Sequence, residues 1–113
     1  MKLTITSILS AELTRRLNSY RLFIAGGEMD QATANHRYLC LQTALWMVAG
    51  GDTPAIRKPE EEVREEIQRW IRTIQRESTV ATVHQDGRVV ALLLEFLEKT
   101  KLITAGAVQT TLI

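Results

Sequence analysis

The residues best suited to chemistry are a histidine and a cysteine, His36 and Cys40, four positions apart. In a helix this spacing places an imidazole beside a thiol, which could act as base and nucleophile or supply two metal ligands. A closed metal site needs two further ligands, and the chain offers only His84 as another imidazole and no second cysteine. We therefore expect Cys40 to be a small buried apolar residue. We expect no metal or cofactor, and a metal or thiol enzyme remains a third interpretation of the function.

Five glutamates lie within residues 60–66, a density that could indicate a carboxylate metal site. Di-metal carboxylate bundles take ligands from several helices and place a histidine three positions after a glutamate. No histidine follows these glutamates at that spacing. We expect a solvated helix face whose acids stabilise the positive end of the helix dipole.

Four arginines, Arg15, Arg16, Arg21 and Arg37, could form a basic surface for DNA phosphates. Residues 1–58 hold seven Lys or Arg against four acids, a charge of +3, and the remainder holds seven against nine, or −2. The overall charge is only +1, and the glutamates of residues 60–66 would repel phosphates. A small DNA-binding transcriptional regulator is therefore the alternative function, and nucleic acid is not the expected partner. The opposite net charges of the two halves also fit contacts between copies of the chain.

The elements that must position these residues are predicted to be helices. Residues 38–49 are apolar at every position except Gln42 and Thr43. A helix that is apolar all round must be covered on more than one side, so this second helix is expected at the centre of the fold. It is predicted to begin at about residue 28 or 30 and to end before Gly50.

Stripes of apolar residues predict a helix on each side of this central one. The first ends at Ala25 and begins at about Ser7 or Ser10, with its stripe at Leu9, Leu13, Leu17, Tyr20 and Ile24. The third follows Pro59, with its stripe at Val63, Ile67, Trp70, Ile71 and Ile74.

The two ends of the chain are less regular. Alternation at residues 3–6 predicts a short strand or an ordered arm, and residues 102–113 could add a strand beside it. A three–four spacing favours one helix over residues 79–99, whereas β-branched residues 79–83 and the Asp86–Gly87 turn signal oppose it. We favour an extended or irregular segment at 79–85, followed by a helix over about residues 88–100.

These patterns predict a mainly α fold: one helical domain over residues 1–113, with four helices, a central apolar second helix and short terminal strands. Apolar content of 45% and charged content of 24% suit an ordinary globular protein. One cysteine, no signal peptide and no apolar segment of membrane-spanning length favour a cytoplasmic protein with no membrane partner. The expected function is non-enzymatic protein–protein interaction or assembly, with self-association as a homodimer or other homo-oligomer and a further protein partner also considered. The candidate interface residues are Tyr38, Leu39, Trp46, Met47 and Trp70.

Overall fold

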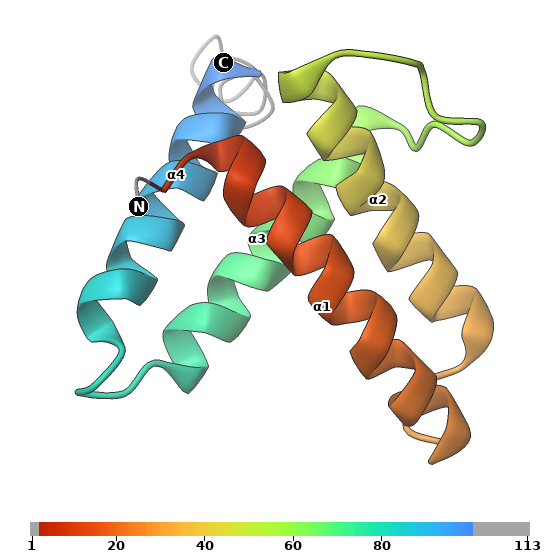
Figure 1. Ribbon diagram of the computed structural model, residues 1–113, viewed down its shortest axis with the longest axis horizontal. Helices are drawn as coiled ribbons and strands as arrows, with labels where there is room; N and C mark the ends of the chain where they lie inside the picture. The colour runs from red at the N-terminus through yellow and green to blue at the C-terminus, as the bar shows by residue number, and fades with distance from the viewer. Residues whose placement is uncertain (1–2, 101–113) are drawn as a thin grey trace, which may run out of the picture.

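The computed structural model describes residues 3–100, which form four helices (Figure 1). These are α1 (Ile5–Ala25), α2 (Gln31–Ala49), α3 (Glu60–Glu77) and α4 (Val83–Lys99). The predicted mainly α fold with four helices is confirmed. Residues 3–100 contain no strand, and the strand expected within 102–113 lies outside the described residues. None of the helices described has the length and apolar character needed to cross a membrane.

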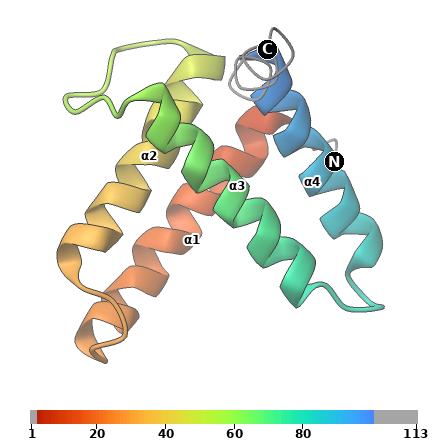
Figure 2. The same cartoon turned by 180° about the vertical axis from the view of Figure 1, so that it is seen from behind.

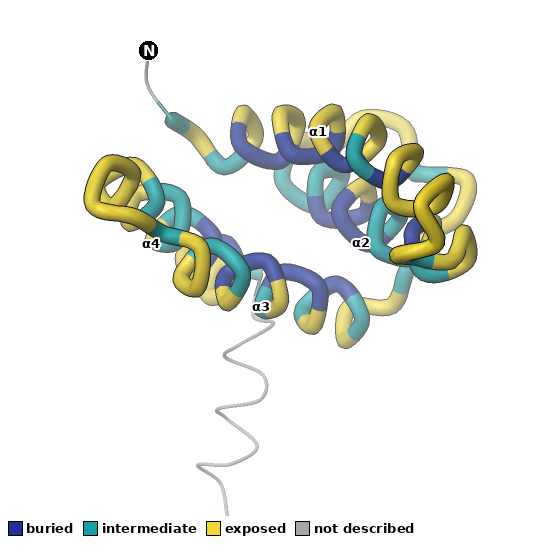
Figure 3. The backbone as a smooth tube through the Cα atoms, turned by 90° about the horizontal axis from the view of Figure 1, so that it is seen from below, coloured by how far each residue is buried: buried dark blue, intermediate teal, exposed yellow. Residues whose placement is uncertain are grey.

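The helices form two antiparallel hairpins, α1 with α2 and α3 with α4, stacked as two layers (Figure 3). The hairpins cross and diverge, so that the molecule has the outline of a V in both face views (Figures 1 and 2). At the closed end, the start of α1 approaches the end of α4. At the open end lie the two hairpin turns, residues 26–30 and 78–82. Helix α1 contacts α2 and α4, and α3 contacts the same two helices.

An aliphatic core joins the two layers, and the buried residues face inward from both (Figure 3). Each helix contributes a leucine or isoleucine that is fully shielded from solvent: Leu9, Leu41, Ile67, Leu93 and Leu97. Burying one such side chain stabilises a fold by about 1.5–3 kcal/mol. The predicted stripe of α3 is confirmed as core, since its members are buried except for Ile74, which is half-buried.

The predicted strand at residues 3–6 is wrong, because α1 already begins at Ile5. Thr4 caps the helix: its hydroxyl accepts a hydrogen bond from the Ser7 amide, and the Ser7 hydroxyl accepts one from the Thr4 amide, both at 3.0 Å. This reciprocal arrangement satisfies two amides that would otherwise lack partners. Alternation of threonine and apolar residues resembles a strand, but the cap and the buried leucines that follow favour the helix.

The favoured interpretation of residues 79–85 is correct for residues 79–82, which are irregular, and wrong for residues 83–85, which are helical. Helix α4 begins at Val83, so Asp86 lies in its first turn and Gly87 in its interior. A glycine inside a helix costs about 1 kcal/mol relative to alanine. Val90 and the buried Leu93 and Leu97 pack into the core from this helix, and their burial outweighs that cost.

The apolar segment 38–49 is helical, and only Gln42 and Ala49 are exposed within it. Helices α1 and α3 pack against α2, and the loop of residues 50–59 folds back onto it. The amide of Lys58 donates to the Thr43 hydroxyl at 3.1 Å, and the Arg57 guanidinium lies 4.7 Å from the centre of the Trp46 ring. Thr43, a polar exception in the segment, therefore anchors the loop that covers α2.

Candidate functional site

The structure brings His36 and Cys40 together, with Nε2 of His36 3.7 Å from Sγ of Cys40. Cys40 is fully buried, and this burial, with the negative charges of Glu66 and Glu62, raises its pKa to about 11. The thiol therefore stays protonated near neutral pH, whereas a nucleophilic cysteine needs a lowered pKa. Within residues 3–100, no group of three or more His, Cys, Asp or Glu could hold a metal ion. The geometry favours a structural role for the pair.

The expectation of a solvated glutamate face is wrong for Glu66, which is only 3% exposed. Its Oε2 lies 2.5 Å from Nη1 of Arg16 on α1, and its Oε1 lies 3.4 Å from Nε of Arg69. Glu66 thus joins the two layers of the fold. Glu60, Glu61 and Glu65 are exposed, as expected for the patch.

Arg16 is the centre of this buried charge cluster, which consists of Glu12, Arg16 and Glu66. Nε of Arg16 donates to Glu12 at 2.8 Å, and Nη1 donates to the Tyr20 hydroxyl at 3.3 Å. The guanidinium also lies 5.6 Å from the centre of the Trp70 ring. Every buried side-chain nitrogen and oxygen in the described part of the chain has a hydrogen-bond partner. The charges of the cluster are therefore paired and hydrogen-bonded, as burial of charge requires.

Burial alone would raise the pKa of Glu12, but hydrogen bonds from Arg15 and Arg16 have the opposite effect. The pKa of Glu12 consequently lies below its ordinary value. The carboxylate therefore stays ionised within the cluster at neutral pH.

The four arginines expected to form a basic surface do not share one open face. Arg16 is buried, Arg15 binds Glu12 at 2.6 Å, Arg37 is half-buried and Arg21 is exposed. The sequence contains a signal for the burial of Arg16, because Arg16 lies in the same helical stripe as Leu9, Leu13 and Tyr20. A charged residue within an apolar stripe predicts a buried ion pair.

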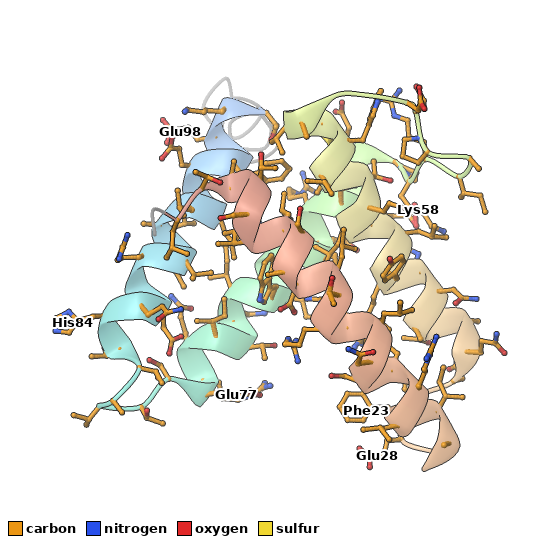
Figure 4. All side chains as sticks on the ribbon, in the orientation of Figure 1. Phe23, Glu28, Lys58, Glu77, His84 and Glu98 are labelled. Carbon is orange, nitrogen blue, oxygen red and sulfur yellow. The ribbon has the colours of Figure 1, made fainter. Side chains whose placement is uncertain are left out.

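A cavity of about 300 Å³ lies between α1 and α3 at the open end. Phe23 of α1 and Glu77 of α3 mark its two sides in Figure 4. A second cavity of about 360 Å³ adjoins it and shares Arg15, Trp70, Thr73 and Glu77. The charged residues that line the first cavity are Arg15, Arg16, Arg37, Glu66, Arg69, Arg76 and Glu77.

The five candidate interface residues are largely covered within one chain. Tyr38, Leu39, Trp46 and Met47 are half-buried, and Trp70 is only 7% exposed. Among the described residues, no strongly exposed large apolar side chain belongs to α2 or α3. Their role at an interface remains a prediction, whereas the packing of Tyr38, Met47 and Trp70 against the core is observed.

Exposed apolar side chains instead continue the stripe of α1 toward the open end. Leu9 and Leu13 are buried at the closed end, but Leu17 is 46% exposed and Phe23 and Ile24 are each 37% exposed. Phe23 follows Tyr20 by three positions and faces the cavity, where α3 has diverged from α1. We call Leu17, Phe23 and Ile24 the open-end apolar surface.

Comparisons of the chain with protein-family models, with curated proteins and with solved structures find no match. The function is therefore argued from two features of the open end: its apolar surface and its arginine-lined cavity.

Proposed function

We propose that this chain is a non-enzymatic protein-interaction or assembly protein that self-associates through the open-end apolar surface. The observation that carries the proposal is the apolar stripe of α1, which continues past the point where the other hairpin covers the helix. Stripe residues of an amphipathic helix face a core, and contiguous exposed apolar patches mark interaction sites. Leu17 and Ile24, seven positions apart, are exposed on one side of α1, and Phe23 lies at the cavity beside them. Leu22 projects from the other side of the helix.

Charge favours a second copy of the chain as the occupant. The half that contains α1 and α2 is basic, and the half that contains α3 and α4 is acidic. Val80 and Val83, both exposed, lie at the open end of the acidic hairpin. In a two-fold dimer, the end of α1 from each copy can meet residues 80–83 of the other, which gives two identical apolar contacts that each join a basic half to an acidic half.

The size of a stable interface sets a further requirement. Such interfaces bury about 800 Å² on each partner. The few apolar side chains at the two turns do not supply an area of this size. The polar residues that surround them on both hairpins therefore belong to the proposed contact. The half-exposed parts of Tyr38 and Leu39 offer additional apolar area on the same hairpin, whereas Trp46 and Met47 lie in the last turn of α2, near the closed end.

The central position of α2 is part of this proposal. Contacts from α1, from α3 and from the loop of residues 50–59 support it. The cytoplasmic location and the DNA-binding alternative remain predictions, and the dispersed arginines of α1 and α2 give the alternative no added support.

The mass in solution, measured by sedimentation or light scattering, tests self-association. We expect the wild type to have about twice the 12.8 kDa mass of one chain. Leu17→Asp should yield a folded monomer, because the exposed side chain contributes little to the core and an interfacial carboxylate must be desolvated.

Leu94→Asp is the matched control, since Leu94 is 45% exposed, nearly the same as Leu17, but lies in the half of α4 nearer the closed end. It should remain dimeric. A monomeric wild type, or equal dissociation of the two variants, would overturn the proposal.

A further inference from the structure

The cavity at the open end contains more positive charge than its own acids neutralise. Five arginines reach it from three helices, against Glu66 and Glu77 in its lining and Glu12, which pairs with Arg15 and Arg16. Both oxygens of Glu66 are already engaged by Arg16 and Arg69. Arg37 makes no ion pair with any residue of the described range 3–100. The cavity therefore has an unneutralised positive charge in a partly enclosed space, where the electrostatic field is concentrated.

We propose that this cavity binds a small phosphate monoester. Guanidinium groups match phosphate oxygens with paired hydrogen bonds, and these charge-assisted bonds are stronger than neutral ones. Arg37 on α2 and Arg76 on α3 approach the cavity from different hairpins, so an anion between them would contact both layers. Among residues 3–100, Arg76 has only the exposed Glu77 as an ion-pair partner, at 3.8 Å.

Hydroxyl groups complete the set of donors. Ser19 and Tyr20 line the same cavity, whereas the hydroxyl of Thr73, which also lines it, already donates to the carbonyl oxygen of Arg69 at 3.0 Å. Burial raises the pKa of Tyr20, so its hydroxyl keeps a proton to donate while its oxygen accepts from Arg16. Phosphate oxygens accept several hydrogen bonds at once, which suits a mixed set of guanidinium and hydroxyl donors.

The organic part of the ester has its own contact surface. Phe23, Met29 and Trp70 line the cavity beside the arginines. A volume of about 300 Å³ lies at the lower limit of ordinary small-molecule sites, which run from ~300 to ~1,000 Å³. Charged donors beside aromatic walls favour a monoester that carries a flat or apolar group over inorganic phosphate.

The α1 side of the site is already organised before a ligand binds. Arg16 is held by Glu12, Glu66 and Tyr20, and Arg15 is held by Glu12. Side chains that are ordered in the free protein lose less conformational entropy on binding.

Calorimetric titration of the full chain with inorganic phosphate and with phenyl phosphate, at constant ionic strength, tests the site. We expect phenyl phosphate to bind more tightly than inorganic phosphate. Arg37→Gln should weaken phenyl phosphate binding at least about tenfold, because it removes a charged donor. The variant should keep the wild-type melting temperature, since Arg37 forms no ion pair in the described part of the chain.

Arg72→Gln is the matched control, because it removes the same charge from an exposed position of α3 outside the cavity. It should leave phenyl phosphate binding unchanged.

Equal weakening by Arg37→Gln and Arg72→Gln, or no binding of phenyl phosphate to the wild type at millimolar concentration, would overturn the proposal. Equal affinity for phenyl and inorganic phosphate, or tighter binding of the dicarboxylate succinate, would overturn the assignment of a monoester. The dimer mass should be the same for Arg37→Gln and the wild type, which separates this test from that of self-association.

Discussion

The two ends of the V use the same helices in different ways. At the closed end, α1 and α4 approach each other, and Leu9, Leu93 and Leu97 are fully buried in an aliphatic core. Toward the open end, α1 and α3 diverge and are joined by the long side chains of Arg16 and Glu66. Leu17, in the same stripe as Leu9, is nearly half exposed there. One amphipathic pattern thus supplies a core over its first half, whereas over its second half Tyr20 stays buried and Leu17 and Ile24 are exposed.

The difference shows how a small chain can combine stability with a binding surface. Aliphatic packing at the closed end is non-directional and excludes water, which makes it suitable for stability. Ion pairs hold two diverging helices at a greater separation, because a guanidinium and a carboxylate together span more distance than two leucines. The divergence leaves a cavity lined by arginines and an apolar face on α1, and these are the features that we propose to be functional.

The largest expected effect concerns the charge cluster. Glu66→Ala should lower the free energy of unfolding by about 3–5 kcal/mol, because it leaves Arg16 buried with one of its two carboxylate partners removed. Urea unfolding followed by circular dichroism measures this loss. Glu65→Ala, the neighbouring exposed glutamate of α3, should change stability by no more than about 0.5 kcal/mol. Similar small losses in both variants would show that the ion pairs do not hold the hairpins together.

The next effect concerns the aliphatic end. Leu9→Ala should lower the free energy of unfolding by about 2–5 kcal/mol, the usual cost of a cavity at a buried leucine. Leu94→Ala removes the same atoms from an exposed site of α4 and should cost about 0.5 kcal/mol or less. Urea midpoints of the two variants give the comparison directly. A loss at Leu94 as large as that at Leu9 would contradict the placement of the core.

The sequence predicts much of the architecture, because periodic apolar stripes report which face of a helix is covered. The stripe of α3 and the glycine-terminated α2 are predicted within a few residues of their observed positions. The start of α1 is missed because a strand-like alternation at residues 3–6 also satisfies a helix cap at Thr4. The start of α4 is missed because Gly87, a local turn signal, is outweighed by packing that involves residues distant in the chain.

The candidate site is predicted less well, for a physical reason. Whether Glu66 and Arg16 are solvated depends on the separation of α1 and α3, which no local pattern specifies. Both residues lie within apolar stripes, and this position is the signal that could have identified them. The exposure of Leu17 also depends on the divergence of the hairpins. The sequence therefore predicts an apolar interface but not its position.

The smallest effect expected is a pH dependence that arises from the charge cluster. The pKa of Glu12 lies below its ordinary value of 4.5 in the folded protein, since hydrogen bonds from Arg15 and Arg16 overcome the opposing effect of burial. Its contribution to stability is therefore complete above pH 4.5 and is lost as the pH falls through the lower, folded-state pKa.

Urea midpoints measured from neutral pH downward should decline more steeply for the wild type than for Glu12→Gln, which cannot titrate. Glu65→Gln removes an exposed carboxyl from α3 and should keep the wild-type decline. If the wild type and Glu12→Gln lost stability equally as the pH falls, Arg15 and Arg16 would not stabilise the ionised carboxylate of Glu12. The proposed electrostatic difference between the two ends of the molecule would then be contradicted.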